Sequence, residues 1–424
     1  MVVTTATVVK AQTERKMTVD ELFQLVESNS KTLQTEKISV EFAQKGIEVA
    51  RTARLPELSA SASVSMNGDV LITDRDFSNV QGFSAPRWGN SLALEAQQVV
   101  YAGGAIDAGI RLAELQYEQA SISTEQRRQQ QRFLALGQYL EIFKLHNREQ
   151  VMQKNIELTR RLIDDIKAKH EQGMALRNDV TRYELQMETL RLNLKKLEDQ
   201  RGILNHQLCN QLDIEGEIVP DLTPNPSPNS EGSEDSWQNM ALASSPSIQQ
   251  TELQQQMAQQ QLKLAKSELL PKVAIVAEDN LSGPFTYDLP PIDKNINFWY
   301  VGVGVKYPIS SLFKQNKKVQ QAQIRTHQAQ KMHEVAAEQL NNQVQQAWTY
   351  YQQAYVELAT QQKSVELAQQ NYQVVSDRYL SQLALITDMI DASNMKLNAE
   401  LQEVDARINI VYAYYRMKYI AGTL

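Results

Sequence analysis

Apolar residues recur with two different periodicities along this chain, and each periodicity predicts a different secondary-structure element. In the longer stretches they recur at spacings of three and four, as at Leu190, Leu194 and Leu197, which is the stripe of an amphipathic helix. No proline interrupts these stretches, so the helices are expected to be very long. They are predicted over about 104–172 and onward to about 212, then over about 313–379 and onward to about 420.

Four shorter segments alternate apolar and polar residues with a period of two, the pattern of a strand with one apolar face. They span about 58–66, 91–96, 272–278 and 299–307. Their length is near the ~10 residues that a tilted strand needs to cross a bilayer, and Trp299 and Tyr307 flank the last one as interfacial aromatics do. A soluble antiparallel sheet with one wet face is the alternative.

A membrane location for these strands would require several chains. Four strands cannot close a barrel, and an open sheet edge cannot lie in lipid because its N–H and C=O groups would stay unpaired. Three chains would supply twelve strands, an even number as barrels of this kind have.

The second half of the chain repeats the first. Ala43-Gln44 and Leu55-Pro56 recur 215 residues later as Ala258-Gln259 and Leu270-Pro271. In both copies a helical pattern ends at Leu-Pro and alternating segments follow. The predicted organisation is an export-signal remnant at 1–11, a first repeat at 12–213, a Pro/Ser-rich linker at 214–234 and a second repeat at 235–424.

Composition narrows the possible classes of protein. The 424 residues include only 7% aromatics, mean hydropathy is −0.45, and no run approaches the ~18–20 apolar residues of a spanning helix, which excludes a helical membrane protein. The net charge of −7 argues against a nucleic-acid partner. The single cysteine, Cys209, excludes a disulfide framework and a cysteine-based zinc site. Val9 and Ala11 fit a signal-peptidase site, with a cytosolic N-terminus as the alternative.

Catalytic patterns fail on inspection, so we expect no enzyme, no cofactor and no metal. His333-Glu334 begins a zinc-protease pattern, but Ala337 stands where the second histidine would be required. Gly302 and Gly304 lie in a strand pattern, and Tyr307 replaces the third glycine of a dinucleotide motif.

One stretch carries a family resemblance. Residues 386–399 read I-T-D-M-I-D-A-S-N-M-K-L-N-A, which resembles the Asp-hydrophobic-hydrophobic-Asp-Ala motif and the following Asn-Ala of TolC-type outer-membrane efflux proteins, or outer membrane factors. The Leu-Pro before each first strand and the terminal Gly-Thr-Leu are also similar, and the likeness extends from Met17 to Leu424.

The resemblance implies a mainly α fold with a membrane β-barrel part. Tandem long helical hairpins would form a trimeric α-barrel, and four strands per chain would form a shared 12-stranded barrel in the outer membrane of a Gram-negative bacterium. The tunnel would extend into the periplasm. It would be the passive exit duct of a tripartite efflux or type I secretion system, with a periplasmic adaptor and an inner-membrane pump as partners. The alternatives are a structural coiled-coil protein, or the periplasmic adaptor of the same machinery.

The resemblance also indicates gate residues. Asp388 and Asp391 are three apart and share a helix face, and the family's motif implies that threefold symmetry places them around an entrance constriction. Solvated acids near a helix start, favoured by the helix dipole, are the alternative. Asp179 is the repeat partner of Asp388, and a latch between Asp179 and Tyr379 is a further hypothesis, with ordinary exposed polar residues as its alternative.

The two helix–helix turns are the expected adaptor contacts. They comprise Gln172, Gly173, Met174 and Ala175 in the first copy, and Ser381, Gln382, Leu383 and Ala384 in the second. Gly173 suits the positive φ that such a turn requires. The family usually has glycine at both turns, so Gln382 is a departure that bears on the geometry of the second turn.

Overall fold

The computed structural model describes residues 14–222, 232–285 and 291–424. The expected export-signal remnant, with Val9 and Ala11, lies outside the described residues, as do residues 223–231 of the predicted linker. The chain divides into two compact units. The helical unit comprises the chain up to Ile38, Ile122–Gln250 and Glu334–Leu424, and the sheet unit comprises Ser39–Ser121 and Thr251–His333. Each unit draws on both halves of the sequence.

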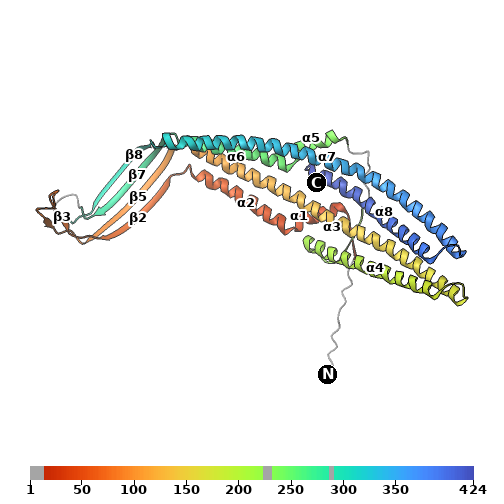
Figure 1. Cartoon of the computed structure of the whole chain (residues 1–424). Coiled ribbons are helices and arrows are strands. Elements are labelled where there is room, and N and C mark those ends of the chain that lie inside the picture. Colours follow the sequence, from red (N-terminus) through yellow and green to blue (C-terminus); the bar gives the residue numbers. More distant parts are fainter. Residues whose placement is uncertain (1–13, 223–231, 286–290) are drawn as a thin grey trace, which may run out of the picture. The chain divides into compact units, whose positions relative to one another are not determined.

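The same series of elements occurs twice along the chain (Figure 1). The first series is β1 (Glu14–Met17), α1 (Val19–Asn29), α2 (Lys31–Thr52), β2 (Glu57–Met66), β5 (Trp88–Tyr101), α3 (Ala105–Glu171) and α4 (Arg177–Leu212). The second is β6 (Glu217–Pro220), α5 (Glu234–Ser244), α6 (Pro246–Ser267), β7 (Lys272–Gly283), β8 (Ile296–Lys306), α7 (Ser311–Leu380) and α8 (Ile386–Ile420). The four long helices and the four strands lie where the two periodicities of apolar residues predict them.

The sheet unit holds one antiparallel sheet in the order β2-β5-β7-β8. The two halves of the chain meet at its centre, where β5 pairs with β7. The outer strands β2 and β8 each pair on one side only within the described residues. The sheet therefore has two free edges of ten and eleven residues.

The two faces of this sheet differ in chemistry because side chains alternate along each strand. One face carries the row Leu58, Ala96, Ala277 and Val301, and the adjacent register row on the other face is Ser59, Glu95, Glu278 and Tyr300. The Tyr300 hydroxyl donates to Glu278 Oε2 at 2.9 Å. The apolar side chains stay exposed, as Leu58 at 76% and Val303 at 70% illustrate. This apolar face has no cover in the described chain.

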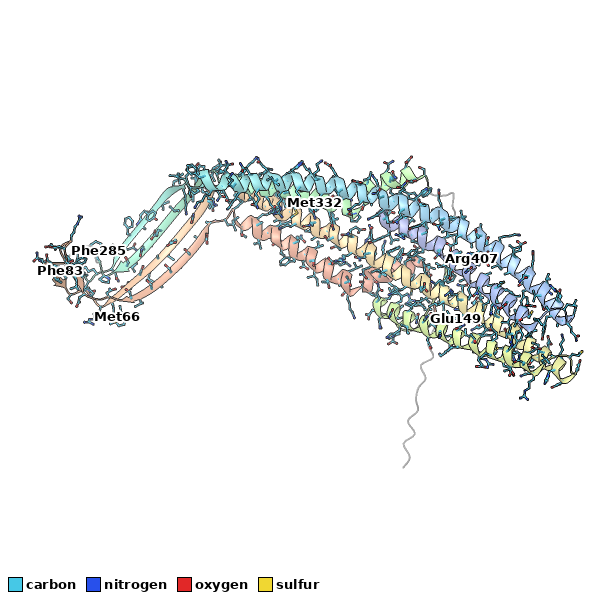
Figure 2. All side chains as sticks on the ribbon, in the orientation of Figure 1. Met66, Phe83, Glu149, Phe285, Met332 and Arg407 are labelled. Atoms are coloured by element: carbon cyan, nitrogen blue, oxygen red, sulfur yellow. The ribbon has the colours of Figure 1, made fainter. Side chains whose placement is uncertain are left out.

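A small hairpin at one end of the sheet unit was not predicted. β3 (Val70–Ile72) pairs with β4 (Gln81–Phe83) inside the connection between β2 and β5. Met66, Phe83 and Phe285 lie at this end (Figure 2). Strands of three residues are too short to leave a periodic signal in the sequence.

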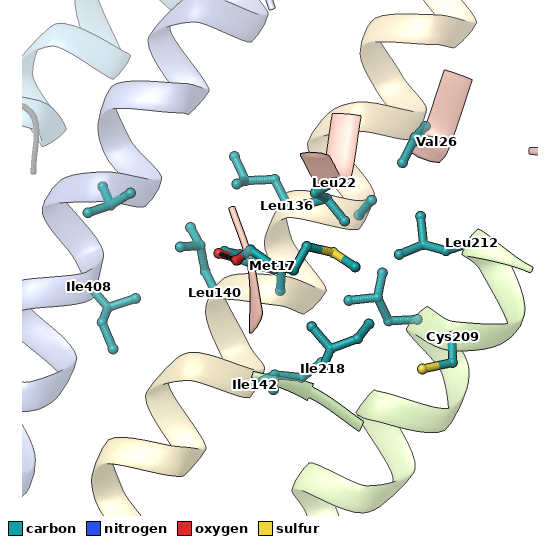
Figure 3. Close-up of a cluster of buried hydrophobic side chains, with 14 of the residues drawn as sticks. Met17, Leu22, Val26, Leu136, Leu140, Ile142, Cys209, Leu212, Ile218 and Ile408 are labelled. Atoms are coloured by element: carbon teal, nitrogen blue, oxygen red, sulfur yellow. Dashed lines mark hydrogen bonds between the residues drawn. The ribbon is translucent and has the colours of Figure 1, made fainter. Parts of the chain in front are cut away.

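In the helical unit, short elements cover one face of the long helices. Leu22 and Val26 of α1 pack into a cluster with Leu136 of α3 and Ile408 of α8 (Figure 3). The parallel pair β1–β6 is tied to the same place by Tyr139, whose hydroxyl bonds the carbonyl oxygens of Met17 at 2.6 Å and Asp221 at 3.0 Å.

The second repeat supplies a matching cluster. Trp237 and Ala241 of α5 pack with Leu340 and Tyr351 of α7 and with Tyr414 of α8. Burial of such side chains is the main stabilising contribution here, at about 1.5–3 kcal/mol for each large apolar group. The long helices therefore have one face that packs against α1 and α5. The opposite face, which α1 and α5 do not cover, is called the open face.

No helix in the described ranges combines the length and the apolarity required to cross a bilayer.

Candidate functional site: the helical tips and their acids

The ends of the two long hairpins pack together in the helical unit. Ile163 and Ile166 of α3, Tyr183 of α4 and Met389 of α8 belong to one buried cluster. Tyr379 of α7 packs against its edge. The tip region is therefore held by apolar contacts that join elements from both repeats.

Both helix–helix turns have the same backbone geometry. At the first, Gly173 N–H donates to His170 O at 2.9 Å and Met174 N–H to Lys169 O at 2.8 Å. These two bonds are those of a Schellman motif, in which the central residue takes a left-handed conformation. Gly173 has φ of 72°, as its position in the sequence predicts.

The second turn reaches this geometry without glycine. Gln382 N–H donates to Tyr379 O at 3.0 Å and Leu383 N–H to Arg378 O at 2.8 Å. Gln382 has φ of 64°. The departure from glycine thus changes the strain at the second turn and leaves its shape unchanged.

The expected adaptor-contact residues are mostly exposed. Met174 is 51% exposed and Leu383 69% exposed, and Gln172, Gly173, Ser381 and Gln382 are exposed as well. Ala175 and Ala384 are half-buried. With Leu176 and Leu385, which are both 70% exposed, each turn therefore presents two large apolar side chains.

Two of the candidate gate acids cap helices within the chain. Asp179 Oδ2 accepts a hydrogen bond from Leu176 N–H at 3.3 Å at the start of α4, and Asp388 Oδ2 accepts from Leu385 N–H at 3.0 Å at the start of α8. A carboxylate here satisfies a free donor and complements the helix dipole. For Asp388 a position near a helix start is the alternative that the sequence left open, whereas for Asp179 the alternative was an ordinary exposed polar residue.

Asp391 differs from these two acids. It is exposed, and no hydrogen bond or ion pair involves it in the described part of the chain. It also shares a heptad position on α8 with Tyr412 and Tyr419, because 391, 412 and 419 differ by multiples of seven. Asp391 therefore lies on the open face of α8, where its charge is not used by the fold.

Tyr379 is positioned by a lysine that sequence reasoning missed. Lys169 Nζ lies 5.6 Å from the centre of the Tyr379 ring and 3.5 Å from Leu380 O, so the end of α3 contacts the end of α7. Burial raises the pKa of the Tyr379 hydroxyl, and the nearby Asp179 carboxylate raises it further. Asp179 and Tyr379 thus interact electrostatically, with no hydrogen bond between them among the described residues. The available signal for Lys169 was its repeat partner Arg378, since both are basic residues in a last helical turn.

A buried lysine lies on α8, away from the helix–helix turn. Lys396 of α8 is 8% exposed, and its Nζ lies 4.9 Å from the ring centre of Tyr372. Its ion-pair partner is Glu400 at 3.8 Å, which also accepts from Asn155 Nδ2 at 2.8 Å. Lys396 thus contacts Tyr372 of α7 and pairs with Glu400 of α8, which in turn bonds Asn155 of α3. These contacts hold α3, α7 and α8 together. Nothing in the sequence pattern separates Lys396 from the exposed lysines.

Two ion pairs lie at a distance from the tips, one between α3 and α4 and one within α8. Glu149 of α3 accepts from Arg201 Nε at 2.9 Å, and Arg407 of α8 pairs with Glu403 at 2.8 Å; Figure 2 marks Glu149 and Arg407. The described residues contain no group of three His, Cys, Asp or Glu side chains suited to hold a metal ion.

Comparison with known proteins identifies the family to which the sequence is similar. The sequence model of the outer membrane efflux protein family matches residues 22–211 and 237–423. The outer membrane efflux protein BepC of Brucella suis biovar 1 (strain 1330) is 20% identical over 402 residues, which covers 93% of this chain and 83% of BepC.

Solved structures show the same fold at low identity. The chain is similar to the outer membrane protein VceC from Vibrio cholerae, with a TM-score of 0.76 and 14% identity over 95% of this chain and 96% of that one. It is similar to CusC, whose crystal structures concern folding and transmembrane channel formation, with a TM-score of 0.81 and 14% identity over 95% and 92%. The chain belongs to the outer membrane efflux protein family, whose members are channels of the outer membrane and not enzymes.

Proposed function

We propose that three copies of this chain form the passive exit duct of an efflux or type I secretion system. The observation that carries the proposal is the sheet β2-β5-β7-β8 with two free edges and one exposed apolar face. In lipid both edges must find partners. Since the strands alternate in direction, β2 of one copy and β8 of the next would pair antiparallel, and three copies would close a 12-stranded barrel.

The chemistry of the two sheet faces indicates which face would lie on the outside of the closed barrel. The apolar face with Leu58 and Val303 would meet lipid, and the face with Ser59, Glu95 and Glu278 would meet water. The strand length agrees as well, since strands of ten to fourteen residues match or exceed the ~9–11 that a tilted strand needs to span the hydrocarbon layer.

In the helical unit the same reasoning orients the long helices. The bulk of α1 and α5 lies on one face, and the open face of α8 carries Asp391 and Tyr412. The covered face would be the outside of a twelve-helix tunnel, because a narrow lumen leaves no room for extra helices. Asp391 would then face the lumen near the tips, together with Asp388, as six carboxylates in a trimer.

Closure of the tip is proposed to rest on contacts between the two hairpins. Asp179 and Tyr379, with Lys169, connect α3 and α4 to the end of α7. A periplasmic adaptor would bind the exposed turns around Met174 and Leu383, and an inner-membrane pump would supply the energy. Opening would separate the hairpin ends, so replacement of both Asp179 and Asp388 by alanine should raise single-channel conductance.

Cysteine cross-linking tests the shared barrel directly. Ser61→Cys on β2 should form a covalent trimer ladder with cysteine at one of positions 300, 302 or 304 on β8, because these side chains share the polar face. Val303→Cys is the matched control, since its side chain lies on the other face. Conductance of the purified protein in a planar bilayer should accompany the ladder. A monomer that neither cross-links nor conducts would refute the duct.

A further inference from the structure

A groove of about 220 Å³ lies between α7 and α8 in the helical unit, far along α8 from the tips. Its lining includes Tyr350, Gln353 and Glu357 of α7, and Asn409, Tyr412 and Arg416 of α8. A cavity of about 150 Å³ is enough to hold benzene, so the groove has room for an aromatic ring and a small substituent.

Arg416 is the unusual residue of this groove. Its guanidinium carbon lies 5.6 Å from the ring centre of Tyr350, and no acidic side chain forms an ion pair with it in the described ranges. Other half-buried arginines of the helical unit have such partners, as Arg148 has Asp405 at 3.1 Å and Arg201 has Glu149 at 2.9 Å. In a chain with a net charge of −7, a half-buried arginine without a carboxylate is a free donor for an anion.

The aromatic walls are held in place by neighbouring rings. Phe133 of α3 lies 5.5 Å from Tyr412 and stacks on Tyr419 at 4.7 Å with an angle of 7° between the planes. Tyr350 and Tyr412 remain 45% and 37% exposed. The groove therefore offers two accessible tyrosine rings and a cation that lies over the Tyr350 ring, and packing against Phe133 limits the motion of the Tyr412 ring.

The groove lies on the open face of the helical unit. On α8, Tyr414 and Met417 belong to the buried cluster that contains Trp237 and Ala241 of α5, whereas Asn409, Tyr412 and Arg416 line the groove. Tyr412 also shares its heptad position with Asp391. This step rests on the proposed function, in which the open face lines the tunnel.

We propose that this groove is a binding site for small planar aromatic anions in transit through the tunnel. The ring of the ligand would stack against Tyr350 and Tyr412, and its sulfonate or carboxylate would accept hydrogen bonds from Arg416. Glu357 at the edge of the groove disfavours a second negative group and orients the ligand with its acid toward Arg416. One such site per copy would retain aromatic anions longer than other solutes of the same size.

Equilibrium binding to the full chain in detergent tests this site. The probe is 2-naphthalenesulfonate, and 1-naphthylmethylammonium is the cation of similar size; both are titrated by calorimetry. Arg416→Gln should weaken sulfonate binding by about tenfold, since a hydrogen bond to a charged group contributes at least that factor. Binding of the ammonium probe should not weaken in this variant. Tyr350→Leu, at an exposed position, should weaken the binding of both probes.

Arg407→Gln is the matched control, because Arg407 lies on the same helix and outside this groove. It should leave sulfonate binding unchanged. Glu357→Gln should tighten it. Equal sulfonate affinity in the wild type and in Arg416→Gln, or equal loss in Arg407→Gln, would overturn the site.

The experiment separates this proposal from the duct. A trimer that conducts but binds no naphthalenesulfonate would overturn the site alone. In a conducting trimer, the sulfonate should also interrupt the current in wild type and far less in Arg416→Gln. Protein that binds the sulfonate through Arg416 but forms no trimer and no channel would refute the duct and keep the groove as a site for aromatic anions.

Discussion

Gln382 at the second hairpin turn has the left-handed backbone of Gly173 at the first, with φ of 64° against 72°. Both residues make the same pair of Schellman hydrogen bonds. A side chain in this conformation costs about 1 kcal/mol, because its Cβ crowds the following carbonyl oxygen. The second tip therefore carries a strain that the first does not.

Gln382→Gly should raise the free energy of unfolding of the tip by about 1 kcal/mol, since the residue keeps its conformation and loses the steric cost. Hydrogen exchange of the amides around positions 380–386 measures this local stability. Gly173→Ala is the reciprocal variant and should lower the protection of the first tip by a similar amount. An added Cβ at Gly173 meets no atom within 4 Å, so only backbone strain contributes there. Equal exchange in Gln382→Gly and wild type would contradict the strain.

Lys169→Gln should favour the open tip, because the lysine contacts the Tyr379 ring and Leu380 across the two hairpins. Loss of a cation–π contact at an exposed site is worth about 0.5–1 kcal/mol, which shifts an opening equilibrium roughly two- to fivefold. Single-channel recording should show a higher open fraction.

Lys167→Gln is the control for Lys169→Gln. Lys167 pairs with Glu184 at 2.8 Å within the first hairpin and forms no ion pair with the second hairpin in the described part of the chain. If both variants open the channel equally, the contact between the hairpins is not what holds the tip closed.

Asp391→Asn should reduce cation selectivity without affecting stability, because the Asp391 carboxylate is exposed and makes no bond within the described chain. The reversal potential in a salt gradient should move toward zero. Asp388→Ala should in addition lower the free energy of unfolding by about 1 kcal/mol, since it removes a capping contact at the start of α8. A reversal potential that stays the same in Asp391→Asn would place this side chain outside the conduction path.

Tyr183→Phe should stabilise the protein, because the buried Tyr183 hydroxyl has no hydrogen-bond partner in the described residues. An unsatisfied buried polar group costs about 1–3 kcal/mol. Tyr139→Phe is the counterpart: its hydroxyl bonds Met17 O and Asp221 O, so its loss should destabilise by about 1–2 kcal/mol. Thermal unfolding of the two variants should move in opposite directions.

Burial of Tyr183 also predicts that the stability of the fold depends on pH in the alkaline range. Burial raises the pKa of Tyr183, so the folded state keeps the proton where the unfolded chain, with a pKa of about 10, loses it. Stability is then full below about pH 10 and falls as pH rises beyond it. Tyr183→Phe should lose less stability than wild type between neutral pH and pH 11. An identical alkaline slope in both proteins would contradict the shift.

The parts of the fold that depend on local pattern followed from the sequence. The 3–4 spacing of apolar residues predicted α3, α4, α7 and α8, and the period of two predicted β2, β5, β7 and β8. The repeat predicted that both halves carry the same elements. These features are visible in one dimension because each residue's environment depends on near neighbours and on which face of its element it occupies.

The candidate site depended less on local pattern. The turn at Gly173 was predictable from one glycine. A position near a helix start was one of two open roles for Asp388, and the capping of α4 by Asp179 was not predicted. The contact of Lys169 with Tyr379 joins residues more than two hundred positions apart. The partner of a charged side chain is decided by the packing of whole helices, which a single sequence does not display.

The sequence by itself determined the elements, their duplication and the two chemically different faces of the strands. Only the tertiary structure decided that β5 and β7 join the two halves, that β2 and β8 keep free edges, and that α1 and α5 cover one face of the long helices. Tertiary structure alone also placed Arg416 over the Tyr350 ring without an ion-pair partner among the described residues. The physical reason is that periodicity specifies which face of an element is apolar, whereas the pairing of faces is set by the packing of segments far apart in the chain.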